Sequence, residues 1–272
     1  MNGLVGVPPE HLLVVFLAGL VTAVSTGLGA LPFFLVDEVS DRWLVVLWGI
    51  ASGILLATAV VGLLPEALAT GATELVVLGT LAGVGLVIAA DRAIGASGFE
   101  PRTLSRSEFE GLALIVGVLT IHSVPEGVAV GVAFADLGLE GDLVVAGIAV
   151  PTLAVFVSIA VSIVNVPEGL AIAIPMRTYG VGRWRTVGWA VASSLPQPVG
   201  AVLAYVFVTT AAGLLPFGFG FAAGAMVYLV AHDMLPDAIE RGRELPGRGR
   251  RELLAGLLVG AVVMAPPLLI FG

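Results

Sequence analysis

The sequence contains no cysteine, and charged residues make up only 12% of its 272 residues. Without cysteine the chain can form no disulfide and offers no thiolate, so any metal must be held by oxygen and imidazole ligands. A charged share about half that of soluble domains, beside 58% hydrophobic residues, excludes an ordinary soluble enzyme. The composition is typical of an all-α polytopic membrane protein, in which the 36 glycines let helix backbones approach closely.

Long apolar runs bounded by charges or turn residues predict eight transmembrane helices in a single domain, residues 1–272. A spanning helix needs about 20 apolar residues. No basic leader precedes the first run, so we count it as a span and not as a cleaved signal peptide. The predicted spans are 11–36, 43–68, 73–90, 109–135, 143–176, 185–212, 214–239 and 252–271.

Lysine is absent as well, and all twelve basic residues are arginines. Every arginine falls in a connection from an odd-numbered span to the next even-numbered span, whereas the opposite connections carry only acids. The positive-inside rule therefore places these connections in the cytoplasm and both termini outside. The missing lysine and the net charge of −8 indicate a prokaryotic host adapted to high salt, such as a haloarchaeon.

Two short motifs occur twice, in spans that run in opposite directions. Val124-Pro125-Glu126-Gly127 in the fourth span returns as Val166-Pro167-Glu168-Gly169 in the fifth. Gly53 precedes Leu64-Pro65-Glu66-Ala67 with the spacing at which Gly224 precedes Leu235-Pro236-Asp237-Ala238. Inverted repeats around proline-broken polar helices are typical of secondary transporters. We predict a 3+2+3 arrangement, with spans one to three and six to eight around spans four and five.

Glu126 and Glu168 lie deep within apolar runs. A charge at the bilayer centre costs about 2.5–3.5 kcal/mol on insertion scales, so such acids are functional candidates. Two neighbouring acids oppose each other's ionisation unless a cation binds between them. His122 lies one helical turn before Glu126, while Ser123 and Asn165 each lie three residues before a glutamate, so all face the same pocket.

A structural interpretation competes with the cation site. A buried glutamate can be a neutral acid hydrogen-bonded to a neighbouring helix, and proline kinks are common in membrane helices. Two antiparallel copies with a histidine favour a cation site.

The paired motifs resemble those of the ZIP (Zrt/Irt-like) metal transporters, whose fourth helix carries His-Asn-x-Pro-Glu-Gly and whose fifth carries a related motif. Here they read His122-Ser123-Val124-Pro125-Glu126-Gly127 and Val164-Asn165-Val166-Pro167-Glu168-Gly169. The resemblance extends over the whole chain, since eight helices with outside termini are the family arrangement. It implies a transporter of zinc or other divalent metals, with neither a prosthetic group nor an enzymatic activity.

The resemblance implies a two-metal transport site formed by His122, Ser123, Glu126, Asn165, Glu168 and Gln197. The sequence departs from the family pattern in three places. Val164 stands where a histidine or glutamine is usual, Ser123 replaces an asparagine, and Gln197 stands where a glutamate is frequent. We therefore expect one strong metal position, with relaxed selectivity among Zn, Cd, Fe and Mn, since ligand type alone does not identify the metal.

Other polar residues lie near the span ends. His232, Asp233 and Asp237, in a stretch similar to a family His-Glu-x-x-Pro-Glu motif, predict an exit-side ligand cluster, although a polar helix end in water explains them equally well. Glu66 either attracts cations at the entrance or is an interfacial acid, and we favour the second interpretation slightly.

The sequence thus predicts a multi-pass plasma-membrane protein that moves divalent metal ions into the cytoplasm by alternating access. Its partners would be the metal ion, the lipid bilayer and a second copy in a homodimer, with no nucleic acid. A membrane metal sensor that binds metal without transport stays open, because Val164 and Gln197 weaken the site. An intramembrane metallohydrolase is less favoured, since its zinc needs two or three imidazoles and the chain has three histidines on three different spans.

Overall fold

The computed structural model describes residues 6–36, 39–69, 72–96, 120, 123–139, 141, 143–178 and 180–264. The fourth predicted span, 109–135, is therefore described mainly by its second half, the helix Ser123–Ala133. His122, most of the connection before this span and the end of the last predicted span lie outside the described residues.

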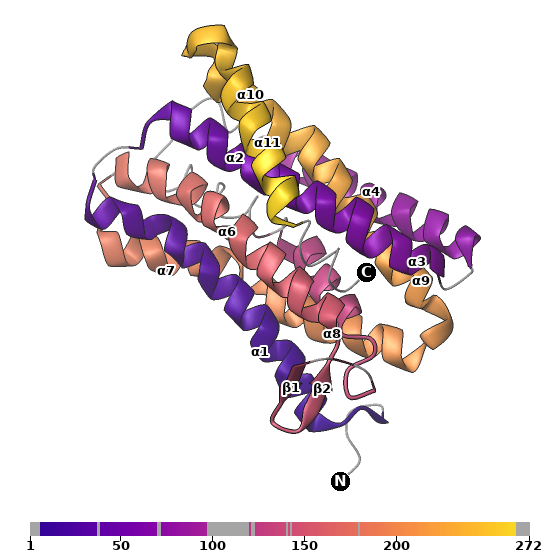
Figure 1. Ribbon diagram of the computed structural model, residues 1–272. Coiled ribbons are helices and arrows are strands. Elements are labelled where there is room, and N and C mark those ends of the chain that lie inside the picture. Colours follow the sequence, from indigo (N-terminus) through magenta and orange to yellow (C-terminus); the bar gives the residue numbers. More distant parts are fainter. Residues whose placement is uncertain are drawn as a thin grey trace.

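Helices make up nearly all of the regular structure, and several predicted spans consist of consecutive helical pieces (Figure 1). The first two spans are α1 (Pro9–Thr26) with the 3-10 helix η2 (Gly27–Phe34), and α2 (Asp41–Ala57) with the π-helical turn η3 (Thr58–Leu63) and α3 (Leu64–Ala69). The next are α4 (Thr73–Ala96), α6 (Thr152–Thr178), and α7 (Arg183–Ser193) with α8 (Pro196–Thr210). The last are η4 (Ala212–Leu214), α9 (Leu215–Leu229), the π-helical turn η5 (Val230–Met234), α10 (Leu235–Arg241), η6 (Gly242–Glu244), η7 (Pro246–Gly249) and α11 (Arg250–Val263).

Five helical segments of the described chain are long and apolar enough to cross a membrane. They are Pro9–Phe34, Asp41–Ala69, Thr152–Arg177, Arg183–Thr210 and Ala212–Glu244, and shorter apolar helices cover Thr73–Ala89 and Ser123–Ala133. Large apolar side chains such as Leu13, Leu81 and Val262 are more than half exposed on the helix surfaces, as expected where lipid is the solvent. The predicted all-α, polytopic membrane architecture is thus confirmed.

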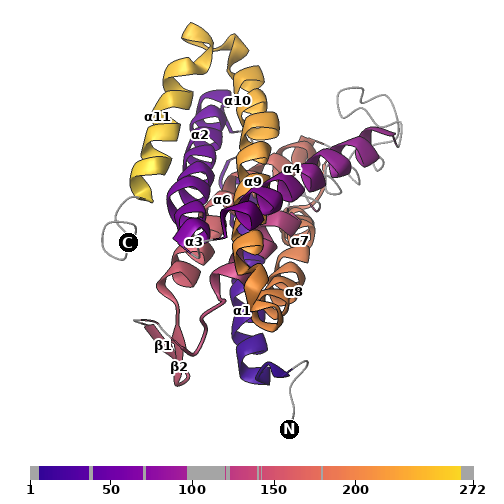
Figure 2. The same cartoon turned by 90° about the vertical axis from the view of Figure 1, so that its right-hand side faces the viewer.

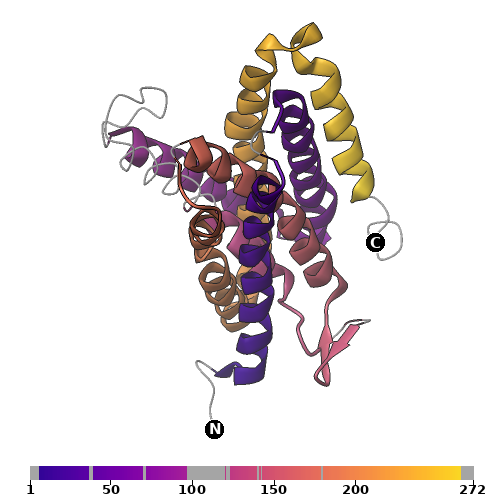
Figure 3. The same ribbon diagram turned by 90° about the vertical axis from the view of Figure 1, so that its left-hand side faces the viewer.

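The fifth predicted span, 143–176, begins nine residues later than expected, at Thr152. Residues 143–150 form an antiparallel hairpin of β1 (Leu143–Val145) and β2 (Ile148–Val150). The two residues between the strands, Ala146 and Gly147, both have positive φ, which is the geometry of a tight hairpin turn. A short run rich in valine and isoleucine is compatible with either a helix or a strand. Its apolar character therefore led to the wrong starting residue for the fifth span. Figure 3 shows this hairpin at the same end of the molecule as the N-terminus.

Four helices form group I, which consists of the close pairs α4 with α9 and α2 with α11. In Figure 2 the connection between α10 and α11 lies at the end of the bundle opposite the hairpin. Both pairs bring a glycine against a backbone carbonyl, so that any added Cβ would overlap the neighbouring helix. The matched contacts are Gly79 on Phe217, Gly83 on Phe221, Gly256 on Val46 and Gly260 on Ile50.

These contacts have the same register in both pairs. The contacted residues Phe217 and Phe221 of α9 lie 171 positions after their counterparts Val46 and Ile50 of α2. The two contacting glycines of α11 likewise lie 177 positions after those of α4. Each of the long helices also carries a π-helical turn directly before its Leu-Pro-acid-Ala motif, η3 before Leu64 and η5 before Leu235. The second sequence echo therefore corresponds to a repeated piece of three-dimensional structure.

Group II consists of α1, the helix Ser123–Ala133, α6, α7 and α8. Here too glycines contact backbone directly: Gly127 and Gly131 contact α8, and Gly169 contacts α1. Two glycines that face the other group have side-chain neighbours instead. A Cβ on Gly62 of η3 would meet the Phe156 ring, and one on Gly218 of α9 would meet valine methyl groups. Group II therefore has close backbone contacts inside it, and at these two glycines it meets group I through side chains.

Candidate functional site

The two repeated Pro-Glu-Gly motifs lie in Ser123–Ala133 and α6, both in group II. Glu126 and Glu168 are 1% and 3% exposed, and they are the only acids among the fully buried residues of the described chain. The two carboxyl groups are close enough to interact electrostatically. Two carboxyl groups this close repel when both are ionised, unless a proton or a cation lies between them.

Gln197 links the two motif helices. Its side-chain Nε2 donates to Glu126 Oε2 at 2.6 Å and to Asn165 Oδ1 at 3.2 Å. Asn165 Nδ2 donates in return to Gln197 Oε1 at 3.0 Å. Three predicted ligands from three different helices therefore meet in one buried network, and all three are at most 1% exposed.

The short polar residue before each glutamate contacts a backbone carbonyl of the adjacent helix. Ser123 Oγ donates to the carbonyl oxygen of Ser193 at 3.2 Å, and Asn165 Nδ2 donates to that of Thr22. Four residues further along those helices, the carbonyl of Gln197 contacts Gly127 and the carbonyl of Thr26 contacts Gly169. Ser193 and Thr22, like Gln197 and Thr26, are 171 positions apart, while the two motifs are 42 positions apart.

The site therefore consists of two half-sites with the same backbone arrangement. The 171-residue spacing is the one that relates group I helices, so one inverted repeat organises both groups. The first half-site contains Glu126, Ser123 and Gln197, and the second contains Glu168 and Asn165, with Thr26 in the place of Gln197.

Sequence reasoning missed four residues of this region: Thr22, Thr26, Ser193 and Ser194. Thr26 Oγ1 and Ser194 Oγ are hydrogen-bonded at 2.7 Å between α1 and the α7–α8 break. The spacing from Gly53 to Gly224 was a usable signal, because the same 171-residue step takes Thr22 and Thr26 to the segment around Pro196.

The repeat also relates Val164 to His122. Val164 is fully buried on α6, and His122 lies outside the described residues. In the part of the chain that the structure describes, no three His, Asp or Glu side chains gather closely enough to hold a metal ion. Within that part, the two glutamates and neutral oxygen and nitrogen atoms make up the site.

The other predicted ligands lie on separate pieces of helix. His232 and Asp233 belong to η5, where the His232 ring stacks on Tyr228 with centroids 5.0 Å apart. Asp237 is exposed on α10, and Glu66 is exposed on α3. These four residues keep their predicted roles as proposals.

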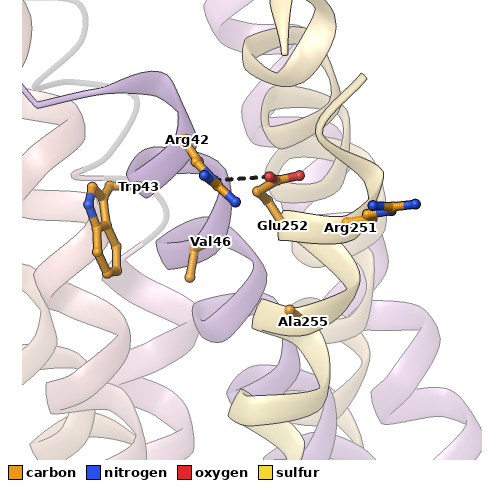
Figure 4. Close-up of a pocket in the computed structure, with 6 residues that line it drawn as sticks. All are labelled: Arg42, Trp43, Val46, Arg251, Glu252 and Ala255. Atoms are coloured by element: carbon orange, nitrogen blue, oxygen red, sulfur yellow. Dashed lines mark ion pairs between the residues drawn. The ribbon is translucent and has the colours of Figure 1, made fainter. Parts of the chain in front are cut away.

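A pocket of about 540 Å³ lies elsewhere, between α2 and α11 (Figure 4). It contains the ion pair of Arg42 Nε and Glu252 Oε1 at 3.1 Å, and the Arg42 side chain is 73% exposed. Exposed ion pairs contribute little to stability. None of the predicted ligands lines this pocket, which we regard as a surface feature at the arginine-bearing end of group I.

Comparison with known proteins identifies the family to which this chain belongs. Residues 100–266 match the family model described as ZIP Zinc transporter. Zinc transporter ZupT of Corynebacterium glutamicum is 30% identical over 273 residues, covering 93% of this chain and 97% of that protein. Zinc transporter ZIP11 of Homo sapiens is 37% identical over 158 residues, covering 58% of this chain and 43% of that protein.

A candidate zinc transporter of Arabidopsis thaliana is 34% identical over 222 residues, which are 81% of this chain and 34% of that protein. The chain thus spans about a third of this plant relative but nearly all of the bacterial one. These relatives are transporters and not enzymes, which removes the metallohydrolase from consideration. The buried glutamate pair, its mirrored surroundings and these matches agree, and the chain belongs to the ZIP family of divalent metal transporters.

Proposed function

We propose that this protein carries divalent metal ions, zinc first among them, into the cytoplasm through the site between Ser123–Ala133 and α6. The buried pair Glu126 and Glu168 carries the proposal. A divalent cation between the two carboxylates removes their mutual repulsion and balances their charge, which buried ionised groups require. The named relatives, zinc transporters of bacteria and animals, support zinc as the first substrate.

The proposed ligands are Glu126, Glu168, Ser123, Asn165 and Gln197, together with His122. One imidazole, two carboxylates and neutral atoms form a harder and less negative set than a site with additional acids. We therefore propose one strong metal position and transport of Cd, Fe and Mn besides zinc.

The proposed topology has eight spans in a 3+2+3 arrangement with both termini outside the cytoplasm. It is supported by the confinement of all twelve arginines to one set of connections. We further propose a homodimer in the plasma membrane of a prokaryotic, salt-adapted host. His232, Asp233 and Asp237 would form an exit-side cluster near the cytoplasm, and Glu66 would lie at the outer entrance or interface.

The two kinds of helix contact support a mechanism of alternating access. Glycine-to-backbone contacts hold group II together, so its helices move as a unit that carries Glu126 and Glu168. Where Gly62 and Gly218 of group I face group II, their neighbours are apolar side chains such as Phe156 and Val132, which form no directional bonds. We propose that group II shifts against group I and exposes the site to either side in turn.

Zinc flux into proteoliposomes tests this function. Glu126→Ala and Glu168→Ala should each lower uptake at least about 100-fold while the protein still elutes as a single folded species. Glu240→Ala is the matched control, because Glu240 is an exposed acid paired only at the surface with Arg243, and its uptake should equal wild type. Normal flux in either site variant contradicts the proposal.

A membrane metal sensor is the second candidate, favoured by fully buried Val164 and neutral Gln197 in the positions of usual ligands. The same proteoliposomes separate the two functions. A sensor binds zinc in equilibrium dialysis but shows no uptake above protein-free vesicles, whereas a transporter shows both.

A further inference from the structure

Thr26 occupies in the second half-site the place that Gln197 occupies in the first. Each residue presents its backbone carbonyl to the glycine that directly follows a site glutamate, Gly169 for Thr26 and Gly127 for Gln197. The Gln197 side chain starts from that position and reaches Glu126. The equivalent starting position places the Thr26 side chain on the Glu168 side of the site.

The Thr26 hydroxyl is held in place but retains capacity for a ligand. It is hydrogen-bonded to Ser194 Oγ at 2.7 Å, and the two residues are 0% and 1% exposed. Each hydroxyl has one proton and two lone pairs, so a hydrogen bond between them leaves lone pairs that can coordinate a cation. Buried hydroxyl oxygens are neutral, hard ligands, which suit divalent metals such as Mn²⁺.

The same point is a junction between helical pieces. The α-helical part of α1 passes into the 3-10 helix η2 after Thr26, and Ser194 lies between α7 and α8. Discontinuous helices near the membrane interior are a recurrent way of holding ions in transporters.

We propose that Thr26, positioned by Ser194, is a further ligand-bearing residue of the metal site and supplies a neutral oxygen from α1 beside Glu168. This inference rests on the proposed function, since it adds a fourth helix to the same site. Metal specificity then depends on two unlike positions, an amide at Gln197 and a hydroxyl at Thr26.

The lack of cysteine allows a direct test. In Thr26→Cys the only thiol of the chain stands at position 26, so Cd²⁺ added alone to purified protein should produce the ultraviolet charge-transfer absorption of a cadmium–thiolate bond. Ser25→Cys is the matched control, because the Ser25 hydroxyl donates to the Val21 carbonyl within α1 and lies outside the hydroxyl pair. Absorption in Thr26→Cys and its absence in Ser25→Cys support the proposal.

The outcome is separable from the proposed function. If wild type and Thr26→Cys bind Cd²⁺ by calorimetry but Thr26→Cys shows no thiolate absorption, this inference is wrong and the transport site stands. If wild type binds neither Zn²⁺ nor Cd²⁺, the proposed function fails, and the inference fails with it.

A second set of variants covers the case in which the cysteine variant does not fold. Thr26→Val should weaken Mn²⁺ binding about tenfold, equivalent to about 1.4 kcal/mol, with a smaller change for Cd²⁺, while Thr26→Ser should bind both as wild type does. A purely structural role predicts lower thermal stability of Thr26→Val with an unchanged ratio of Mn²⁺ to Cd²⁺ affinity. That result overturns the inference.

Discussion

The half-site around Glu126 and the half-site around Glu168 have matching backbones and different side chains. In both, a polar residue three positions before the acid binds a carbonyl of the adjacent helix, and the glycine after the acid contacts that helix directly. The first half-site offers the hydroxyl of Ser123 and the long amide side chain of Gln197, whereas the second offers the amide of Asn165 and the short hydroxyl of Thr26.

The backbone and the side chains of the two half-sites therefore have different roles. The repeated backbone contacts position two acids on antiparallel helices, which is the arrangement that inverted repeats produce in secondary transporters. The side chains around the acids are not bound by that symmetry, so they can differ and thereby set the metal preference. Three pairs of substitutions at matched positions test this view.

The largest effect is expected from alanine at the paired glycines Gly29 and Gly200. An added Cβ at Gly29 would overlap the carbonyl oxygen of Val166, whereas at Gly200 it would lie 3.4 Å from the corresponding oxygen of Val124. Gly29→Ala should destabilise the protein by about 3 kcal/mol or prevent folding, and Gly200→Ala should stay within about 0.5 kcal/mol of wild type. Thermal unfolding in detergent measures both, and equal effects would contradict the difference in packing.

An intermediate effect is expected at the polar residues before the acids. Asn165→Ala removes the hydrogen bonds that join α6 to Thr22 of α1 and to Gln197 of α8, whereas Ser123→Ala removes the bond to the carbonyl of Ser193. We expect zinc uptake to fall about tenfold or more in the first variant, in the range seen for groups that orient metal ligands, and only about twofold to threefold in the second. Initial rates in proteoliposomes provide the comparison, and a larger loss for Ser123→Ala would show that the first half-site is the more demanding one.

The smallest effect is expected from adding a ligand at Val164, the counterpart of His122. Val164→His places a second imidazole in the second half-site and should tighten zinc binding about threefold to tenfold, while overpacking costs about 1–3 kcal/mol of stability. Val164→Leu controls for the packing change alone. Zinc titration by calorimetry decides, and equal affinities in the two variants would mean that position 164 does not face the metal.

Much of the fold followed from local chemistry. Long apolar runs predicted membrane helices, because a helix that crosses a bilayer needs about 20 apolar residues. The confined arginines agreed, because basic residues collect in the cytoplasmic connections of membrane proteins. The acids Glu126 and Glu168 stood out because an ionisable group inside a membrane is energetically costly, so its presence there indicates a function. Their burial and their electrostatic interaction in the structure agree with that interpretation.

Two features escaped prediction for different physical reasons. The hairpin at 143–150 has an apolar, branched composition that suits either a strand or a helix, so only the pairing of Leu143 with Val150 decides between them. Thr26 and Ser194 are small polar residues of a kind common in membrane helices, and only the packing of α1 against the α7–α8 junction brings their hydroxyls together.

The scarce charges of this chain and its long apolar runs were enough to indicate a membrane protein and its pair of buried acids, and the arginines predicted an orientation. Hydropathy and charge act on each residue separately, so they can be recognised without knowing its neighbours. The matching of the two half-sites depends on contacts between helices more than 100 residues apart, such as Asn165 with Thr22 and Ser194 with Thr26. Those contacts depend on close packing, which exists only once the helices are assembled.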